Sequence, residues 1–276
     1  MKRLAVVSDL HCGSIYGLLP PDFLTFEGVP KLQNAGQKYL WECWLNFCGI
    51  VEDFDPHAVI VNGDDVDGLQ RKNDGSELSL TNWKDQKDAA IKTLKVLRSV
   101  TRKAKWYFTQ GTPYHTGHFG DAEEDIAEAM DATAYPSLGT GKLCRETLTL
   151  AVDGGVIIEA AHHISTASVY KTTPLEKEMQ ATWMNVVNNE CPLPDLQIRS
   201  HVHNYSNVEQ GLGRAITTPC WQLQTRYARK KSVHRLMPHI GGVLVEADYQ
   251  AKKRGTSACQ VRREIYKLPP VKIAQL

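Results

Sequence analysis

Short apolar runs alternate with helix-like segments over most of the chain, and this alternation limits the folds that it can adopt. Apolar runs of strand length lie at residues 2–8, 58–61, 105–109, 156–160 and 196–198. Helix-like segments lie at residues 40–54, 91–100, 121–130 and 173–189. Strands that alternate with helices predict an α/β fold whose sheet is largely parallel at first. After Cys191 the pattern becomes strand-rich, with further apolar runs at residues 214–218 and 243–247.

Length and charge set broad limits on the organisation of the chain. Its 276 residues suffice for one large domain or two small ones, and a net charge of +1 gives no overall field that would attract nucleic acid or a membrane. Any binding of anions must therefore be local. Residues 13–30 form a long aperiodic stretch, and loops of that length are usually functional or disordered. We expect this stretch to be a loop, with a lid over a functional site as its candidate role.

Neither a membrane span nor a secretory signal is recognisable in the sequence. The first apolar run, at residues 4–7, is too short for the core of a signal peptide. The seven cysteines are odd in number, widely spaced and without a Cys-x-x-Cys pair, which favours reduced thiols over a disulfide framework or a zinc–cysteine site. We therefore expect a cytoplasmic protein that has no membrane partner.

Each of the five early apolar runs is followed closely by aspartate, by histidine or by both. In chain order these residues are Asp9 and His11, Asp64 and Asp67, His115, His162 and His163, and His201 and His203. Ligands of α/β sheets gather outside the carboxyl ends of the strands, so these side chains are predicted to meet at one edge. Residues two apart in an extended segment point the same way, which lets Asp9 and His11 grip one ion. Gly63 relieves crowding where the backbone turns to expose Asp64.

Each of these groups taken alone has an ordinary explanation. An Asp-x-His sequence recurs by chance, and a lone pair of histidines is more often a surface feature than a metal site. Five groups at five strand ends in order are not easily explained in that way. The sequence therefore favours a metal centre of imidazoles and carboxylates, a mixture that suits manganese, iron, zinc or nickel, of which we favour manganese.

In order and spacing, these motifs resemble those of the calcineurin-like metallophosphoesterase superfamily. The motifs are Asp9-x-His11, Gly63-Asp64-x-x-Asp67, Gly111-x-x-x-His115, His162 and His201-x-His203. The resemblance implies a four-layer α/β/β/α sandwich formed by a single domain over residues 1–276, with a strand-rich basic C-terminal part. It also implies a site that holds two divalent metal ions.

The resemblance further implies a role for each motif residue. The implied metal ligands are Asp9, His11 and His203 for the first ion, His162 and His201 for the second, and Asp64 as a bridge between both. His163, which follows His162 directly, is the alternative ligand at that position. His115 would be the catalytic acid, and Asp67 would be its anionic partner.

Two departures from the family pattern lie at the third strand end. The family usually has Gly-Asn-His there, with the asparagine on the second ion and the histidine as the acid, whereas this chain has Gly-Thr-Pro-Tyr-His at residues 111–115. Thr112 thus stands where the family has a metal-binding asparagine, and the histidine comes two residues later. That offset leaves His118 as an alternative for the acid. At the last motif, Ser200 replaces the usual glycine.

The chemistry expected of such a site is the hydrolysis of a phosphate ester. Two cations bridged by a carboxylate would clamp the phosphate oxygens and lower the pKa of a bridging water, whose hydroxide attacks phosphorus in line. An imidazolium would protonate the leaving oxygen, and it needs an anionic partner because it lies beside two cations.

A basic segment after the last motif bears on the substrate. Its cations are Arg226, Arg229, Lys230, Lys231 and Arg235, with Tyr227 among them and no acidic residue between. A run of charge is usually a solvated face, but cations with an aromatic ring near the site would also suit a nucleotide or a nucleic-acid strand. We therefore favour a phosphodiesterase or nuclease over a phosphomonoesterase acting on a protein or a small molecule. The rival from another class is a non-catalytic module that binds metal or phosphate through a degraded third motif.

Overall fold

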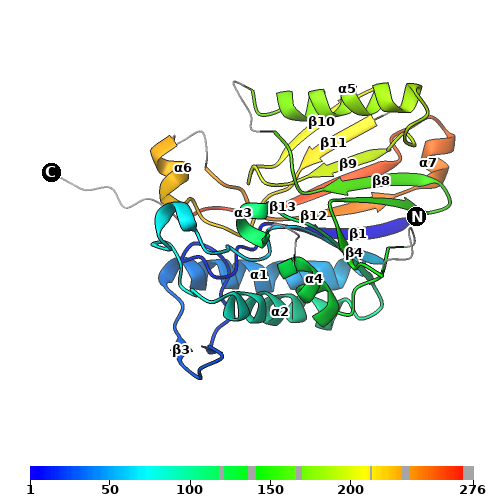
Figure 1. The fold of residues 1–276 in the computed structure, drawn as a ribbon. Helices are drawn as coiled ribbons and strands as arrows, with labels where there is room; N and C mark the ends of the chain where they lie inside the picture. The colour runs from blue at the N-terminus through cyan, green and yellow to red at the C-terminus, as the bar shows by residue number, and fades with distance from the viewer. Residues whose placement is uncertain (118–120, 136–140, 166–169, 212, 232–236, 270–276) are drawn as a thin grey trace.

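The computed structural model describes residues 1–117, 121–135, 141–165, 170–211, 213–231 and 237–269. His118, the alternative acid, and Arg235 of the basic segment lie outside these residues. Within them the chain forms two large mixed β-sheets that stack face to face, with helices on both outer faces (Figure 1). The predicted α/β fold class is confirmed.

The first sheet has six strands in the described residues, in the order β13-β12-β1-β4-β5-β6. Their bounds are β1 (Lys2–Val7), β4 (Ala58–Asn62), β5 (Lys105–Thr109), β6 (Cys144–Arg145), β12 (Ile240–Ala247) and β13 (Cys259–Tyr266). β1, β4, β5 and β6 pair in parallel, as predicted for the early part of the chain. β12 and β13 extend the sheet in antiparallel pairing.

The second sheet has five strands in the described residues, in the order β10-β11-β9-β8-β7. Their bounds are β7 (Thr147–Val152), β8 (Val156–Ala161), β9 (Leu196–Arg199), β10 (Ser206–Gln210) and β11 (Gly213–Thr217). The inner strands β8, β9 and β11 pair in parallel, and β7 and β10 pair antiparallel at the two edges. The strand-rich pattern after Cys191 thus supplies strands to both sheets.

Helices cover the outer face of each sheet (Figure 1). Those on the six-stranded sheet are α1 (Ala35–Phe54), α2 (Trp83–Val100) and α4 (Asp121–Ala129), and the one on the five-stranded sheet is α5 (Thr173–Val187). α1 starts at a capping box, in which the Asn34 side chain accepts from the Gln37 amide and the Gln37 side chain accepts from the Asn34 amide. The capping box fixes where this helix begins.

Three apolar clusters hold these layers together. Val7 and Trp44 belong to the cluster between the helices and the six-stranded sheet, whereas Val6 and Ile198 belong to the cluster between the two sheets. Val6 and Val7 can serve different clusters because successive residues of a strand point to opposite faces. Leu175 of α5 packs in a third cluster on the far side of the five-stranded sheet. The order of the layers is therefore helices, sheet, sheet and helix.

The aperiodic stretch 13–30 is partly built into the core. Leu18 and Leu19 are fully buried, and a short hairpin of β2 (Phe23–Leu24) and β3 (Pro30–Lys31) follows, projecting at the lower left of Figure 1. A role of this stretch as a lid remains a prediction.

In the described ranges, no helix has both the length and the apolar character that crossing a bilayer requires. The seven cysteines all fall in these ranges as free thiols.

Candidate metal centre

The carboxyl ends of five strands bring the motif residues to one end of the stacked sheets. Asp9 follows β1 and Asp64 follows β4 in the six-stranded sheet, whereas His162 follows β8 and His201 follows β9 in the five-stranded sheet. The predicted meeting of these side chains is thus observed, but across two sheets rather than along one edge of a single sheet. The centre lies where the two sheets face each other.

Asp9, His11 and His203 form a first group of ligand atoms that lie within 4.8 Å of one another. The Nε2 atoms of His11 and His203 are 3.2 Å apart, and Nε2 of His203 is 3.1 Å from Oδ1 of Asp9. Two imidazole nitrogens and a carboxylate oxygen thus converge on one point. These three residues are the ones that the family resemblance implies as ligands of the first ion.

Asp64, His162 and His201 form a second such group. Nε2 of His162 lies 3.0 Å from Oδ2 of Asp64. Burial and the nearby His162 lower the pKa of His201 to about 4, which keeps its imidazole neutral and able to donate a lone pair. His163 is exposed and meets only the ring of His201 among the described histidines, at 5.1 Å between centroids. The geometry therefore favours His162 over His163 as the ligand.

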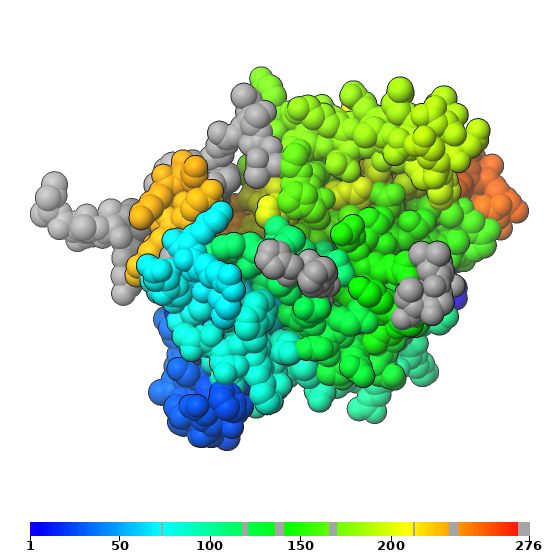
Figure 2. Space-filling view, viewed as in Figure 1, coloured from blue at the N-terminus to red at the C-terminus, as the bar shows by residue number. Residues whose placement is uncertain are grey.

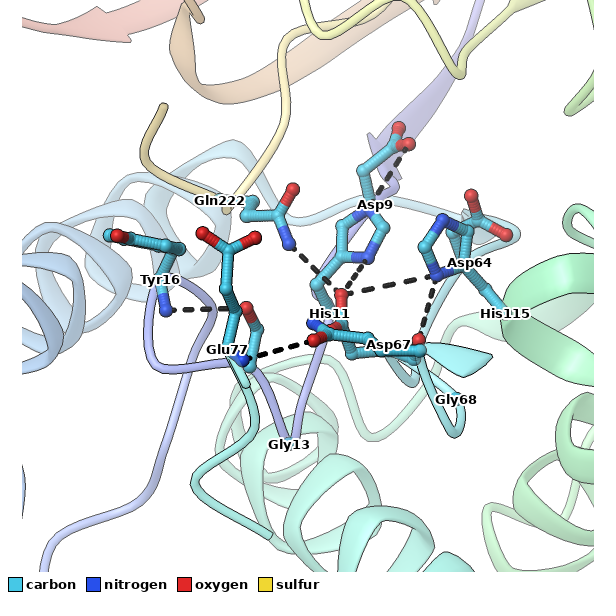
Figure 3. Close-up of polar contacts among 12 residues, drawn as sticks. Asp9, His11, Gly13, Tyr16, Asp64, Asp67, Gly68, Glu77, His115 and Gln222 are labelled. Atoms are coloured by element: carbon cyan, nitrogen blue, oxygen red, sulfur yellow. Dashed lines mark hydrogen bonds and ion pairs between the residues drawn. The ribbon is translucent and has the colours of Figure 1, made fainter. Parts of the chain in front are cut away.

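The donor atoms are suited to divalent metal. Nδ1 of His162 donates to the carbonyl oxygen of Asn62 at 2.6 Å, and Nδ1 of His11 bonds to Oδ1 of Asp67 at 2.9 Å (Figure 3). These bonds leave Nε2 of each ring as the nitrogen available to a metal ion, as is usual for histidine ligands. Neither buried oxygen of Asp9 accepts a well-aligned hydrogen bond from the described residues. Because a buried carboxylate that lacks well-aligned donors is costly, these oxygens fit a cation.

Opposite charges within the centre shift the pKa values of its members. Burial opposes the charge of Asp9, yet His162 and His203 hold its pKa at about 2. Burial likewise opposes the charge of Asp64, yet His162 and His115 hold its pKa well below the usual range. In the other direction, Asp64 and Asp9 overcome burial and raise the pKa of His162 to about 10. A divalent cation would compete with the protons of such imidazoles.

Most of the predicted ligands have a backbone conformation that few residues adopt readily. Five of the six predicted ligands have left-handed φ angles, namely Asp9, His11, Asp64, His201 and His203, at 47° to 69°. Such conformations cost about 1–3 kcal/mol each and cluster at functional sites. Gly63, with a φ of 78°, would bring a Cβ within 2.7 Å of Nδ1 of His162, so the role predicted for this glycine agrees with the geometry.

Thr112 is bonded to Asp64 with both of its polar groups. Its amide nitrogen donates to Oδ1 and its hydroxyl to Oδ2, each at 2.6 Å. The preceding Gly111 allows this approach, because a Cβ there would lie 2.2 Å from Oδ1 of Asp64. Thr112 therefore orients the carboxylate that is predicted to bridge the ions, which differs from the ligand role of the family's asparagine.

His115 lies on the short helix α3 (Pro113–Thr116), and its hydrogen bond to Asp67 differs from the expected one. Its Nδ1 donates to the backbone carbonyl of Asp67 at 2.8 Å, whereas the carboxylate of Asp67 is 3.9 Å away. That carboxylate instead accepts from His11, from the Gln70 side chain and from the Gln222 side chain, the last at 3.0 Å (Figure 3). Asp67 thus supports both His11 and His115, through different oxygens.

Several side chains of the centre were not anticipated from the sequence. Gln86 is fully buried and holds the loop after β4 through the amides of Asp67 and Gly68. Burial and the charge of Asp64 raise the pKa of Asp65 to about 8, and burial with Asp65 raises that of Glu123 well above its usual range. Both shifts favour the neutral, protonated carboxyl, in contrast to the lowered pKa values of Asp9 and Asp64. No spacing in the sequence marks these positions.

No protein-family model matches the chain, and no curated protein matches it. Among solved structures, it is similar to an archaeal phosphodiesterase, with 11% identity and a TM-score of 0.44 over 96% of this chain and 99% of that one. It is also similar to Zn²⁺-complexed Vps29 from Entamoeba histolytica, with 11% identity and a TM-score of 0.42 over 95% and 98% of the two chains. A dimetal phosphatase from Danio rerio is similar at 8% identity and a TM-score of 0.44, over 88% and 92%.

The sequence motifs occur in the expected order along the chain, and their side chains meet at one place in the structure. In these motifs and in their meeting, the chain resembles the calcineurin-like metallophosphoesterases. The two triads join the Asp-x-His, Gly-Asp and His-x-His motifs of that superfamily in one centre.

A cleft of about 520 Å³ opens from the metal centre. Its base includes His11, Asp64 and His203, and its walls come from both sheets, from α6 (Arg226–Lys231) and from the start of α5. Figure 2 shows α6, in orange, beside the cyan segment near residue 70 at the rim. The cleft is much larger than a lone phosphate needs.

The basic segment lies beside this cleft rather than inside it. Tyr227 and Ala228 of α6 line the cleft, but its four described cations do not; these are Arg226, Arg229, Lys230 and Lys231. The amide of Arg226 donates to Oε1 of Glu77 at 3.0 Å, and the guanidinium of Arg229 lies over the ring of Tyr16. Among the described residues, the lysines and arginines that line the cleft are Lys72 and Lys171, which the sequence interpretation missed.

Proposed function

We propose that this chain is a dinuclear metal-dependent phosphoesterase that hydrolyses phosphodiester bonds in nucleotides or nucleic acid. The observation that carries the proposal is that two triads of candidate ligand atoms lie at the same end of the two stacked sheets. These triads are Asp9, His11 and His203, and Asp64, His162 and His201. Asp64 belongs to the second triad and also groups with His11 of the first, which suits a carboxylate that bridges two ions.

When bound, two divalent cations would neutralise charge on the phosphate oxygens and lower the pKa of a water between them. The chain's own residues would orient the ligands and supply the proton. Because Nδ1 of His115 donates to the carbonyl of Asp67, Nε2 is the nitrogen that is free to exchange a proton. His115 would deliver that proton to the leaving oxygen.

The cleft supports a diester substrate over a monoester. Its volume leaves room for groups on both sides of a phosphate at the centre, and the rings of Tyr114 and Tyr227 line it. We expect hydrolysis of bis(4-nitrophenyl) phosphate with added manganese to exceed that of the mono-ester. A preference for the mono-ester would support the phosphomonoesterase alternative instead.

A non-catalytic module that binds metal or phosphate is the second candidate. It is favoured by Thr112, which stands where the family has a metal-binding asparagine and is engaged with Asp64. Metal binding without turnover of either nitrophenyl ester, across manganese, iron, zinc and nickel, would support this candidate over the enzyme.

The two metal sites should differ in affinity. The first has Asp9, His11 and His203, with Asp64 as the proposed bridge. The second has His162, His201 and Asp64 but no amide ligand, because Thr112 stands at that position, and the Thr112 hydroxyl is already bonded to Asp64. Protein purified without added metal should hold the first ion well and the second partially, and activity should rise with excess manganese. Metal analysis and titration calorimetry on the apo protein measure both sites. Two tight sites that fill in parallel would show that another residue completes the second one.

The same titration should depend on pH in a defined direction. The pKa of His162 is raised to about 10, so its imidazole carries a proton near pH 7 and must lose it to bind metal. The apparent affinity of the second site should therefore rise with pH from 6 to 9, by up to about tenfold per unit for each proton released. Calorimetry in buffers of different ionisation enthalpy counts these protons.

The basic helix α6 should assist long substrates. Replacing Arg229, Lys230 and Lys231 together by alanine should raise KM for a long nucleic-acid strand and flatten its salt dependence, because cations release counterions from the backbone. The change should hardly affect bis(4-nitrophenyl) phosphate, since these side chains do not line the cleft. If activity falls equally on both substrates, or on neither, the basic segment is an ordinary solvated face.

A further inference from the structure

Two lysines reach the cleft from opposite halves of the sandwich. Lys72 lies in the turn Arg71–Asn73 that follows β4 of the six-stranded sheet. Lys171 lies just before α5, which covers the five-stranded sheet. Both side chains are exposed, and the ligands at the base of the cleft lie between the two sheets. A substrate held at the metal centre therefore has a cation on either side.

Lys171 is held in place by a neutral partner. Its Nζ donates to Oδ1 of Asn204 at 2.6 Å, and Asn204 is only 5% exposed. The backbone of Asn204 is fixed in turn, because its carbonyl accepts from the Thr217 hydroxyl at 2.5 Å. An amide orients the ammonium group without cancelling its charge. Lys171 therefore keeps two N–H donors and a full positive charge for a ligand.

Lys72 is also paired with a neutral group. Its Nζ lies 5.6 Å from the centroid of the Tyr114 ring, within the range of a cation–π contact. Within the described part of the chain, neither Lys72 nor Lys171 has a carboxylate within ion-pair distance. By contrast, Arg226 on the neighbouring helix is already engaged with Glu77. Among the described residues of the cleft wall, these two lysines are therefore positive charges that no carboxylate neutralises.

Two exposed aromatic rings line the same cleft, Tyr114 beside Lys72 and Tyr227 beside Lys231 of α6. Tyr114 is 39% exposed and Tyr227 is 61% exposed, and both line the cleft. Exposed rings beside cations are the pattern on which single-stranded nucleic acid binds, with bases stacked on the rings and phosphates on the charges. The scissile phosphate must reach ligands that are at most 2% exposed, such as Asp9 and His11. A single strand can present one phosphate at that depth.

We propose that Lys72 and Lys171 bind the phosphates that flank the scissile phosphate of a single nucleic-acid strand, so that the cleft selects substrates with at least three consecutive phosphates. This inference rests on the proposed function, because it places the scissile phosphate at the metal centre. The flanking phosphates would lie on the two sides of that centre, one toward α3 and one toward α5. The lysines would leave the chemistry at the centre unchanged.

The test compares thymidylate substrates of different length in manganese buffer. The dinucleotide with one internal phosphate offers nothing to the lysines, whereas a hexanucleotide offers phosphates on both sides. Lys171→Ala and Lys72→Ala should each lower kcat/KM for the hexanucleotide by about tenfold, as expected for one charged hydrogen bond, and change it less than about twofold for the dinucleotide. Each should also reduce the slope of log kcat/KM against log salt by about 0.7.

Two matched variants serve as controls. Lys171→Arg keeps the charge and should keep the salt slope. Lys95→Ala removes an exposed lysine from α2, which lies on the outer face away from the cleft, and should behave as the parent. A ribonucleotide hexamer should show the same loss on Lys171→Ala, because the contact is to phosphate and not to sugar.

The outcomes separate this inference from the proposed function. Equal loss on the dinucleotide and the hexanucleotide, or hydrolysis by the parent without any length preference, overturns the role of the lysines while the phosphodiesterase stands. If the parent hydrolyses no ester at all, the proposed function fails, and binding of a labelled hexanucleotide by fluorescence anisotropy decides the inference. In that binding experiment, weaker binding of the hexanucleotide by both alanine variants supports the role of the lysines, and unchanged binding overturns that role.

Discussion

Asp64→Asn should abolish hydrolysis and lower the metal content while the fold stays intact. Asp64 is the carboxylate that groups with ligands of both triads, so the substitution removes a negative charge from both sites at once. Loss of a residue that only supports a ligand costs about 10–100-fold in metal affinity or activity, and loss of a shared ligand should cost more than that.

The fold should survive this substitution for two reasons. Asparagine tolerates the left-handed backbone at this position, where φ is 55°. Its amide can also bond to Thr112, with the oxygen accepting from the backbone N–H and the nitrogen donating to the hydroxyl. Circular dichroism and thermal melting check the fold, and elemental analysis checks the metal.

A surface carboxylate provides the matched control for that experiment. Asp88→Asn makes the same change on α2, at a partly exposed residue that pairs with Lys84, and should leave activity and metal content unchanged. Parental activity in Asp64→Asn would remove the basis of the whole site assignment.

His115→Ala should slow the hydrolysis of esters with poor leaving groups far more than that of activated esters. A general acid contributes about 10²–10⁴-fold where the leaving oxygen needs a proton, and little where a nitrophenolate departs unaided. The measurement is kcat/KM on a series of alkyl and aryl phosphodiesters, with metal content determined on the same samples.

Two results would assign another role to His115. It also lies within ligand reach of His11 and Asp64, so an equal loss on all esters with a lower metal content would make it a metal ligand. If His118→Ala shows the leaving-group dependence and His115→Ala does not, His118 is the acid.

The sequence was informative where a strand contains a largely buried apolar run and polar candidate ligands follow it closely. Such runs lie at residues 4–7 in β1, 58–61 in β4 and 106–108 in β5, and residues beyond these strands meet in the centre. β13 was missed because it is an edge strand with many polar residues and a largely exposed face. β10 was missed for the same reason.

The supporting contacts of the site could not be predicted from spacing. Gln222 reaches the carboxylate of Asp67 across 155 positions of sequence, and nothing in its neighbourhood marks it as part of the centre. The choice of His11 rather than His115 as the partner of that carboxylate depends on distances of about one ångström. Charge runs were misleading in a similar way, since the long basic run lies beside the cleft while Lys72 and Lys171 line it.

The position of the centre between two sheets has a consequence for the durability of the protein. Each triad takes ligands from both sheets, as Asp9 comes after β1 and His203 after β9, and Asp64 after β4 and His162 after β8. Each bound cation would therefore cross-link the two halves of the stack at that end. Binding at 100 times Kd favours the folded state by about 2.7 kcal/mol per site. The local supply of divalent metal would then govern how long the folded chain resists heat and proteases, separately from how fast it turns over substrate.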